Sequence, residues 1–368
     1  MKLVGNRQRL LEAFTVVGSV VSPRSIKPIL QNVRMLVSPE GATLLATDLE
    51  VAIRYRLDLD EVEEGGDVLL PAGKVLRILR ESESTSVTFK TDAQGVEIIS
   101  GNGRFKVLSE DPEEFPVVPS FDDSTAFSLD KAPFQALIRK TSFATAKERT
   151  RFAFNGVRFE VEGDEARMIA TDGKRMAVKV LPIENPDELN IGRIIPTKGL
   201  LTFDRVLTDD EGQVRISLQD KQVIIKAGQT EVSSRLVEGM FPNFRTVIPK
   251  ETPFSARFQI NELRSALRRS AILTNDESKS VRMTFNDGQV ILSSRAIDVG
   301  EAEIEVEAEC EGKPFDVAFN PDYLIDGLKV MDAESVTLKL SGRDTAALLD
   351  GEENFTYVIM PVTLRTGS

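Results

Sequence analysis

Apolar residues recur along this chain in two rhythms, one typical of helices and one typical of strands. Helical spacing from about Asn6 joins Leu3, Leu10, Leu11, Phe14, Val17 and Val21. Ser22-Pro23 interrupts that run, and period-2 alternation then predicts strands at about 30–37, 42–47 and 50–58. A second helix is predicted over 71–81 with Pro71 at its first position, followed by strands at about 86–90, 95–99 and 104–109.

The same order of elements occurs three times. Equivalent strands open 124 residues apart at Val33-Arg34-Met35, Val157-Arg158-Phe159 and Val281-Arg282-Met283. An Ala-Thr-Asp turn follows at Asp48 and Asp172, and a weaker Leu292-Ser293-Ser294-Arg295 stands in the third copy. Leu70-Pro71, Ile195-Pro196 and Phe319-Asn320 each open a second helix. Landmarks that share one period indicate three homologous units rather than one large domain.

Each copy contains a helix-then-strands block twice, so the chain reads as six copies of one small motif. The later helices are predicted near 131–147, 197–207, 261–273 and 320–331. This pattern predicts an α+β fold in which each unit packs two helices on two antiparallel sheets. Polar and proline-rich residues near 122–124 and 249–252 predict domains at 1–123, 124–250 and 251–368.

The residue types that are missing restrict the chemistry. The 368 residues include no histidine and only Cys310 as a cysteine, which excludes imidazole-based catalysis and the usual zinc sites. The glycine-rich phosphate-binding motifs are absent as well. We therefore expect a protein without catalytic residues, cofactor or metal. A signal peptide and an apolar run of about 18 residues are also missing, which predicts a cytoplasmic protein.

Charge is distributed unevenly between helices and strands. The net charge is −12, yet five of the six helix windows lean positive and together the six carry +9. Lys74, Arg77 and Arg80 share one solvent face, and Arg264 and Arg268 repeat the pattern. Ordinary solvated helix faces would explain any single helix, but five of six in an acidic protein favour a function.

Helices that line a ring would form a positive channel. With axes about 8 to 10 Å apart, twelve helices leave a hole of about 28 Å, whereas six leave only roughly 10 Å. One chain therefore could not encircle a duplex, and two could.

Several short motifs in this order and spacing resemble the bacterial sliding clamp family, the beta subunit of DNA polymerase III, from Met1 to about Leu364. These motifs are Pro28-Ile29-Leu30-Gln31-Asn32-Val33, Ala46-Thr47-Asp48-Leu49-Glu50-Val51-Ala52, Ala170-Thr171-Asp172-Gly173-Lys174-Arg175-Met176, Gly239-Met240-Phe241-Pro242-Asn243-Phe244, Ile272-Leu273-Thr274-Asn275, Phe319-Asn320-Pro321-Asp322-Tyr323-Leu324 and Tyr357-Val358-Ile359-Met360-Pro361.

The resemblance implies a head-to-tail homodimer, a ring that encloses double-stranded DNA without sequence preference and slides along it. Such a ring is a processivity factor that tethers replicative and other DNA polymerases, the clamp loader and repair proteins through short linear peptides. Retention by topology needs only a modestly basic channel and little contact with bases.

The resemblance implies a partner-peptide cleft and a dimer interface, and together with the charge pattern it assigns the DNA-facing residues. The DNA-facing residues are Arg24, Lys74, Arg77, Arg80, Lys140, Lys198, Arg205, Arg264 and Arg268. The partner-peptide cleft is Arg151, Phe154, Thr171, Gly173, Arg175, Met176, Pro242, Val247, Asn320, Tyr323, Val358, Met360, Pro361 and Val362. The dimer interface joins Lys74, Ile78, Arg104 and Phe105 of one chain to Ile272, Leu273, Glu301, Glu303 and Glu305 of the other.

Some positions depart from the family pattern. Glu148 stands where a polar DNA-contacting side chain is frequent, and Thr363 replaces a frequent arginine. Ala153, Lys174 and Ala346 occupy cleft positions that are often larger or differently polar, and Arg365 to Ser368 extend past the usual end.

Two alternatives remain open at this point. A carboxylate-based hydrolase would use Asp48 and Asp172, although equivalent residues of separate repeats would not meet in one site. A monomeric repeat-built binding protein, such as an adhesin or carbohydrate binder, would show a monomeric mass in solution.

Overall fold

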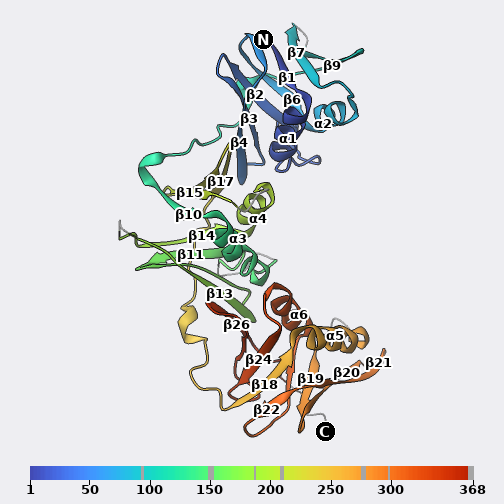
Figure 1. Cartoon of the computed structure of the whole chain (residues 1–368), viewed down its shortest axis with the longest axis vertical. Helices are drawn as coiled ribbons and strands as arrows, with labels where there is room; N and C mark the ends of the chain where they lie inside the picture. Colours follow the sequence, from blue (N-terminus) through green and yellow to red (C-terminus); the bar gives the residue numbers. More distant parts are fainter. Residues whose placement is uncertain are drawn as a thin grey trace. The chain divides into compact units, whose positions relative to one another are not determined.

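The computed structural model describes residues 1–92, 95–147, 153–185, 188–207, 211–274, 279–296 and 299–363. Its elements follow one order six times, a strand, a helix and then three strands (Figure 1). This confirms the sixfold reading of the sequence and the α+β class.

The first repeat contains two such copies. The first copy is β1 (Lys2–Asn6), α1 (Arg7–Gly18), β2 (Asn32–Ser38), β3 (Gly41–Thr47) and β4 (Val51–Leu57). The second copy is β6 (Gly66–Pro71), α2 (Ala72–Glu81), β7 (Ser86–Asp92), β8 (Gly95–Ser100) and β9 (Gly103–Val107). The additional strand β5 (Glu61–Glu64) pairs with β1.

The middle repeat has the same organisation. Its first copy is β10 (Ala126–Asp130), α3 (Lys131–Arg139), β11 (Gly156–Glu162), β12 (Glu165–Thr171) and β13 (Arg175–Pro182). Its second copy is β14 (Ile191–Pro196), α4 (Thr197–Val206), β15 (Gln213–Leu218), β16 (Gln222–Ala227) and β17 (Thr230–Arg235).

The third repeat completes the series. Its first copy is β18 (Phe254–Gln259), α5 (Ile260–Ser270), β19 (Val281–Phe285), β20 (Gln289–Ala296) and β21 (Gly300–Glu307). Its second copy is β23 (Val317–Phe319), α6 (Pro321–Val330), β24 (Ser335–Leu340), β25 (Ala347–Asp350) and β26 (Phe355–Ile359). The additional strand β22 (Glu309–Glu311) pairs with β18.

Three predicted boundaries were wrong. Leu3 belongs to strand β1, because the chain pairs with β7 before helix α1 starts. Pro71 ends β6 and stands before α2 rather than at its first position. The predicted helix over 131–147 ends at Arg139, where the Thr141 hydroxyl donates to the Leu137 carbonyl at 2.6 Å and a short 3-10 turn follows.

Two sheets continue across the repeat boundaries. Strand β4 of the first repeat pairs antiparallel with β17 of the middle repeat, and β13 of the middle repeat pairs with β26 of the third. The resulting sheets have the orders β10-β15-β16-β17-β4-β3-β2-β6 and β14-β11-β12-β13-β26-β25-β24-β18-β22. Each junction therefore joins the last strand of a first copy to the last strand of a second copy.

Two strands of the same kind stand at sheet edges. Strand β9 ends the sheet β5-β1-β7-β8-β9, and β21 ends the sheet β21-β20-β19-β23. Strand β9 is the equivalent of β17, and β21 is the equivalent of β4. These two strands could therefore form a third junction of the same kind, but within the described part of the chain they are not paired with each other. An edge strand presents unpaired backbone groups and can pair with another chain.

Contacts divide the chain into two compact units. Unit 1 is Met1–Phe134 with Lys198–Leu236, and unit 2 is Gln135–Thr197 with Val237–Ser368. In unit 1 helix α1 packs against α2, and in unit 2 α5 packs against α6. The helices bury apolar faces, such as Leu10, Phe14 and Val17 of α1, against the sheets. Among the described helices, none is long and apolar enough to span a membrane.

Candidate partner-binding site

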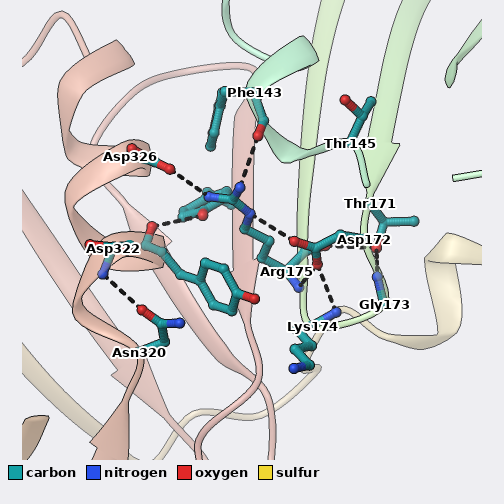
Figure 2. A network of polar contacts seen from close by, with 12 residues as sticks. Phe143, Thr145, Thr171, Asp172, Gly173, Lys174, Arg175, Asn320, Asp322 and Asp326 are labelled. Carbon is teal, nitrogen blue, oxygen red and sulfur yellow. Dashed lines mark hydrogen bonds and ion pairs between the residues drawn. The ribbon is translucent and has the colours of Figure 1, made fainter. Parts of the chain in front are cut away.

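The Ala-Thr-Asp motif forms a turn that is held by its own side chains (Figure 2). Thr171 Oγ1 accepts from the Gly173 backbone N–H at 3.0 Å, and Asp172 Oδ1 accepts from the N–H groups of Lys174 and Arg175 at 2.9 and 3.0 Å. Gly173 adopts φ +88, which favours glycine. The carboxylate of Asp172 is therefore occupied by its turn, as expected for an aspartate that follows a strand.

Arg175 links this turn to helix α6. Its Nε donates to Asp172 at 3.1 Å, its Nη1 to Asp326 at 2.9 Å and its Nη2 to the Phe143 carbonyl at 2.9 Å (Figure 2). The guanidinium also lies over the Tyr323 ring at 4.6 Å. Burial alone would lower the pKa of Arg175, but its partners, among them the carboxylates of Asp326 and Asp172, raise it overall. With 8% of its surface exposed, Arg175 is a fixed cation in the wall of the site rather than a mobile residue at its rim.

Tyr357 stands behind this network. Its side chain is fully buried, and its hydroxyl donates to the Tyr323 carbonyl of α6 at 2.8 Å. Burial raises the pKa of this hydroxyl, so it stays neutral and donates its hydrogen bond. The network therefore fixes α6, and with it Tyr323, against strand β26.

An apolar surface adjoins the charged network. Met176 and Val358 belong to a buried cluster completed by Ile169, Val178 and Phe244. Strand β26 continues as a chain segment in which the Met360 N–H donates to the Lys174 carbonyl at 2.8 Å and the Val362 N–H to the Ala318 carbonyl at 2.7 Å. The side chains that remain exposed beside the cluster are Val247, Met360 and Val362.

Phe154 forms another part of this surface. Its ring meets Phe241 edge to face at 6.4 Å and lies against the Gly173 turn. Pro242 and Pro361 are half-buried, and Asn320 caps α6 by accepting from the Asp322 N–H at 3.0 Å. Contacts thus connect most of the predicted cleft residues, all within unit 2, whereas Arg151 and Glu148 lie outside the described residues. Of the departures, Ala153 is buried and Lys174 is exposed.

Sequence reasoning missed four residues of this site. Asp326 and Phe143 hold Arg175, while Phe241 and Phe244 build the apolar surface. The repeated Phe-Pro segment at 241–242 was a usable signal for the aromatic residues. Asp326 offered none, because it is one of 58 acidic residues.

The predicted DNA-facing residues occupy different environments. Arg24, Lys74, Arg77, Arg80, Arg205 and Arg268 are exposed, and Arg264 is half-buried. Lys198 donates to Asp48 at 2.5 Å and Glu50 at 3.0 Å. Burial lowers the pKa of Lys198, but these two hydrogen bonds raise it overall. Lys140 is 6% exposed, and its ammonium bonds Glu352 and, at 2.8 Å, Asp332.

The predicted dimer residues lie on or beside the two edge strands. Arg104 and Phe105 are exposed on β9, and Glu301, Glu303 and Glu305 are exposed on β21. Lys74 and Ile78 belong to α2, while Ile272 and Leu273 follow α5 in a 3-10 turn that contacts β21. Ile272 is 72% exposed.

Three copies of one α+β domain, with sheets that continue from copy to copy, define a DNA-clamp fold. Family models agree over most of the chain: the N-terminal, central and C-terminal domains of the DNA polymerase III beta subunit match residues 1–119, 128–243 and 245–363. The beta sliding clamp of Pseudomonas putida is 34% identical over 363 residues, which cover 97% of this chain and 98% of that protein. The Escherichia coli K12 beta sliding clamp is 28% identical over 367 residues, covering 99% and 100%.

Solved structures lead to the same family. The DNA polymerase III subunit beta from Pseudomonas aeruginosa superposes with a TM-score of 0.95 at 31% identity, covering 99% of this chain and 100% of that one. The sliding clamp from Bacillus subtilis gives 0.94 at 25% identity with the same coverage. The chain belongs to the DNA polymerase III beta subunit family, the beta sliding clamps. It is a non-catalytic subunit, as predicted, and the hydrolase reading of Asp48 and Asp172 is wrong.

Proposed function

We propose that this chain forms a head-to-tail homodimeric ring that encloses double-stranded DNA in the cytoplasm and tethers polymerases and other partners to it. The three domains are assigned to 1–123, 124–250 and 251–368. Membership of the sliding-clamp family supports this function. The observation that carries the ring is the complementarity of the two open strand edges, β9 and β21.

The two closed junctions share one register, which can be transferred to the open edges. In the first junction Ala52, Ile53 and Arg54 face Ser233, Val232 and Glu231. In the second junction the equivalent residues Met176, Ala177 and Val178 face Val358, Tyr357 and Thr356. Hairpin pairing makes Glu301, Ala302 and Glu303 the equivalents on β21, and Lys106, Phe105 and Arg104 the equivalents on β9.

The transferred register pairs opposite charges. Glu301 of one chain would face Lys106 of its partner, and Glu303 would face Arg104. Between them, Ala302 would cover Phe105, whose equivalents Val232 and Tyr357 are both buried. Directly opposed charges and a covered aromatic ring each stabilise antiparallel strands by roughly 0.2–1 kcal/mol. This chemistry supports a second copy as the partner of both edges.

Basic residues of the helices, with Arg24 in the loop after α1, would supply the face toward DNA. We assign Arg24, Lys74, Arg77, Arg80, Lys198, Arg205, Arg264 and Arg268 to this face. Lys140 is left out of the set because its ammonium is buried on Glu352. Apart from Lys198, which bonds Asp48 and Glu50, these cations have no ion pair among the described residues. Such cations suit a loose, salt-sensitive attraction to phosphates.

The apolar surface beside Arg175 is assigned to peptide segments of polymerases, loader and repair proteins. Its methionine and aromatic residues can adapt to several apolar peptides. A Pseudomonas aeruginosa clamp solved with griselimycin supports ligand binding in this family.

The decisive experiment compares lifetimes on DNA. Protein placed on circular and on linear duplexes by a clamp loader should dissociate far faster from the linear molecule, because it can slide off the ends. Blocking both ends of the linear duplex with bound protein should restore the long lifetime. Equal lifetimes on open linear and circular DNA would contradict enclosure.

A further inference from the structure

A pocket in unit 1 stands at the position that the peptide cleft occupies in unit 2. It has a volume of about 260 Å³ and lies over the junction of β4 and β17. Its lining includes Thr47, Leu49, Glu50, Val117, Ser233 and Arg235. All of these residues belong to unit 1.

The register of the two junctions relates this lining to the cleft. The hairpin and junction pairs make Thr47, Leu49, Ala52, Ser233 and Arg235 equivalent to Thr171, Gly173, Met176, Val358 and Met360. The backbone hydrogen bond from Met360 to Lys174 has its counterpart from Arg235 N–H to the Glu50 carbonyl at 3.2 Å. The pocket is therefore the repeat-related copy of the proposed cleft.

The supporting turn and core are also duplicated. Leu49 N–H donates to Thr47 Oγ1 at 3.0 Å, and the N–H groups of Glu50 and Val51 donate to Asp48 Oδ1, as in the turn at Asp172. Beneath the pocket, Leu45, Ala52, Phe115 and Val118 form a buried cluster. It corresponds to the cluster around Ile169, Met176 and Phe244.

Leu49 has a strained backbone conformation, whereas glycine occupies the equivalent position in the other turn. It adopts φ +77, in the left-handed region where Gly173 stands in the second turn. Its side chain is nonetheless 38% exposed at the pocket, and the neighbouring Val117 is 92% exposed. An exposed aliphatic residue held in a strained conformation contributes little to the core, which indicates a contact with something outside the described chain.

The positive charge of Arg235 in the lining indicates what kind of ligand the pocket would bind. Where the cleft has Met360, the pocket has Arg235, which is exposed and has no ion-pair partner among the described residues. Glu50, the opposite charge in the lining, is already bound by Lys198 at 3.0 Å. An uncompensated guanidinium beside aliphatic side chains suits a carboxylate next to an apolar group.

We propose that this pocket is a second peptide-docking site, which takes an extended segment with an aliphatic side chain next to an acidic residue. Leu49 and Val117 would contact the aliphatic group, with the buried Val51 behind them, and Arg235 would bind the carboxylate. The volume is slightly below the ~300 to 1,000 Å³ of drug-sized sites and suits one or two side chains. The proposal rests on the proposed function in that it assumes peptide partners.

The test is a methyl NMR titration of the full-length protein with the blocked peptide acetyl-Leu-Asp-Leu-amide. The methyl signals of Leu49, Val51 and Val117 should shift saturably, and the matched Asn peptide should bind at least fivefold more weakly. Arg235→Glu should weaken binding at least tenfold, whereas Lys90→Glu, at an exposed position of β7 in the same unit, should not. Leu49→Gly should weaken binding without lowering the urea midpoint, because it relieves the strained φ.

The same spectra separate this proposal from the proposed function. Signals of Val358 and Met360 report the cleft, and Met360→Glu should leave the titration at Leu49 unchanged. Absence of shifts at Leu49, Val51 and Val117 up to millimolar peptide would overturn the second site, whatever the cleft does. Shifts there that are insensitive to both Arg235→Glu and the Asn peptide would overturn it as well.

Discussion

Gly327 of helix α6 faces the ring of Tyr357 so closely that a Cβ at this position would stand 2.3 Å from Tyr357 Cε1. Alanine is ordinarily the better helix residue by about 1 kcal/mol. Here we expect Gly327→Ala to lower the free energy of unfolding by about 1–3 kcal/mol, because the fully buried ring of Tyr357 cannot move away from the added methyl group. Urea unfolding measures the change.

Gly73 of helix α2 is the matched control for that substitution. A Cβ there meets nothing within 4 Å. Gly73→Ala should therefore leave stability unchanged or raise it by up to about 1 kcal/mol. Equal effects of the two substitutions would show that Tyr357 does not restrict α6.

Removal of the Asp326 charge should weaken the attachment of α6. Asp326→Asn leaves Arg175 buried with one carboxylate partner fewer, and we expect a loss of about 1–3 kcal/mol in urea unfolding. Lys329, which also bonds Asp326, is half exposed. Lys329→Met should lower the free energy of unfolding by less than about 0.5 kcal/mol. A larger loss would show that the exposed Lys329–Asp326 pair, rather than the Arg175–Asp326 pair, stabilises the helix.

Acid should destabilise the protein through two carboxyl groups. Burial raises the pKa of Asp326 and of Glu352, but hydrogen bonds from Arg175 and Lys329, and from Lys140 and Lys179, lower both overall. Each of these two carboxyl groups therefore binds fewer protons in the folded protein than in the unfolded chain. Its stabilisation is therefore complete above the ordinary values of 3.8 and 4.5 and is lost as the pH falls through the lower folded pKa.

Urea midpoints measured from about pH 6 to pH 3 test this pH dependence. The double variant Asp326→Asn with Glu352→Gln should be less stable at neutral pH and should lose less stability on acidification. A profile as steep as that of the unchanged protein would assign the acid sensitivity to other carboxylates.

The transferred strand register predicts a charge swap. Glu303→Arg should weaken the dimer at least tenfold in sedimentation, and Arg104→Glu should do the same, because each would oppose like charges across the seam. Combining both substitutions in one chain should restore most of the affinity. Failure of the double variant to recover, with both single variants folded, would place a different pair of residues opposite each other.

Met360 offers a test of the apolar surface. It is 37% exposed, so Met360→Glu should change stability by no more than about 0.5 kcal/mol. Affinity for a fluorescent peptide from the polymerase should fall at least tenfold, as measured by anisotropy. Ile26→Glu, which alters an isoleucine that is 99% exposed in a loop of unit 1, is the control and should bind normally.

The repeated pattern predicted most of the fold, because each copy carries its own helix periodicity and strand alternation. The pairing of β4 with β17 could not be predicted that way, since the two strands are far apart in sequence and share no local signal. Lys140 illustrates the same difficulty for the site. Its basic neighbourhood indicated a solvated helix face, but the structure places Glu352, from a distant hairpin, against its ammonium. Similarly, the family motif indicated Arg175 but not Asp326, which neutralises it.

The continuous sheets have a consequence for dividing this chain. A fragment that ends near residue 250 would retain β13 but lose β26, which supplies its hydrogen-bonding neighbour. The row of bare backbone amides and carbonyls would then be open to other copies of the fragment, and aggregation is the expected fate of such material. A single repeat is thus a unit of duplication in the sequence but not a self-sufficient module, and excision should follow strand pairings rather than repeat limits.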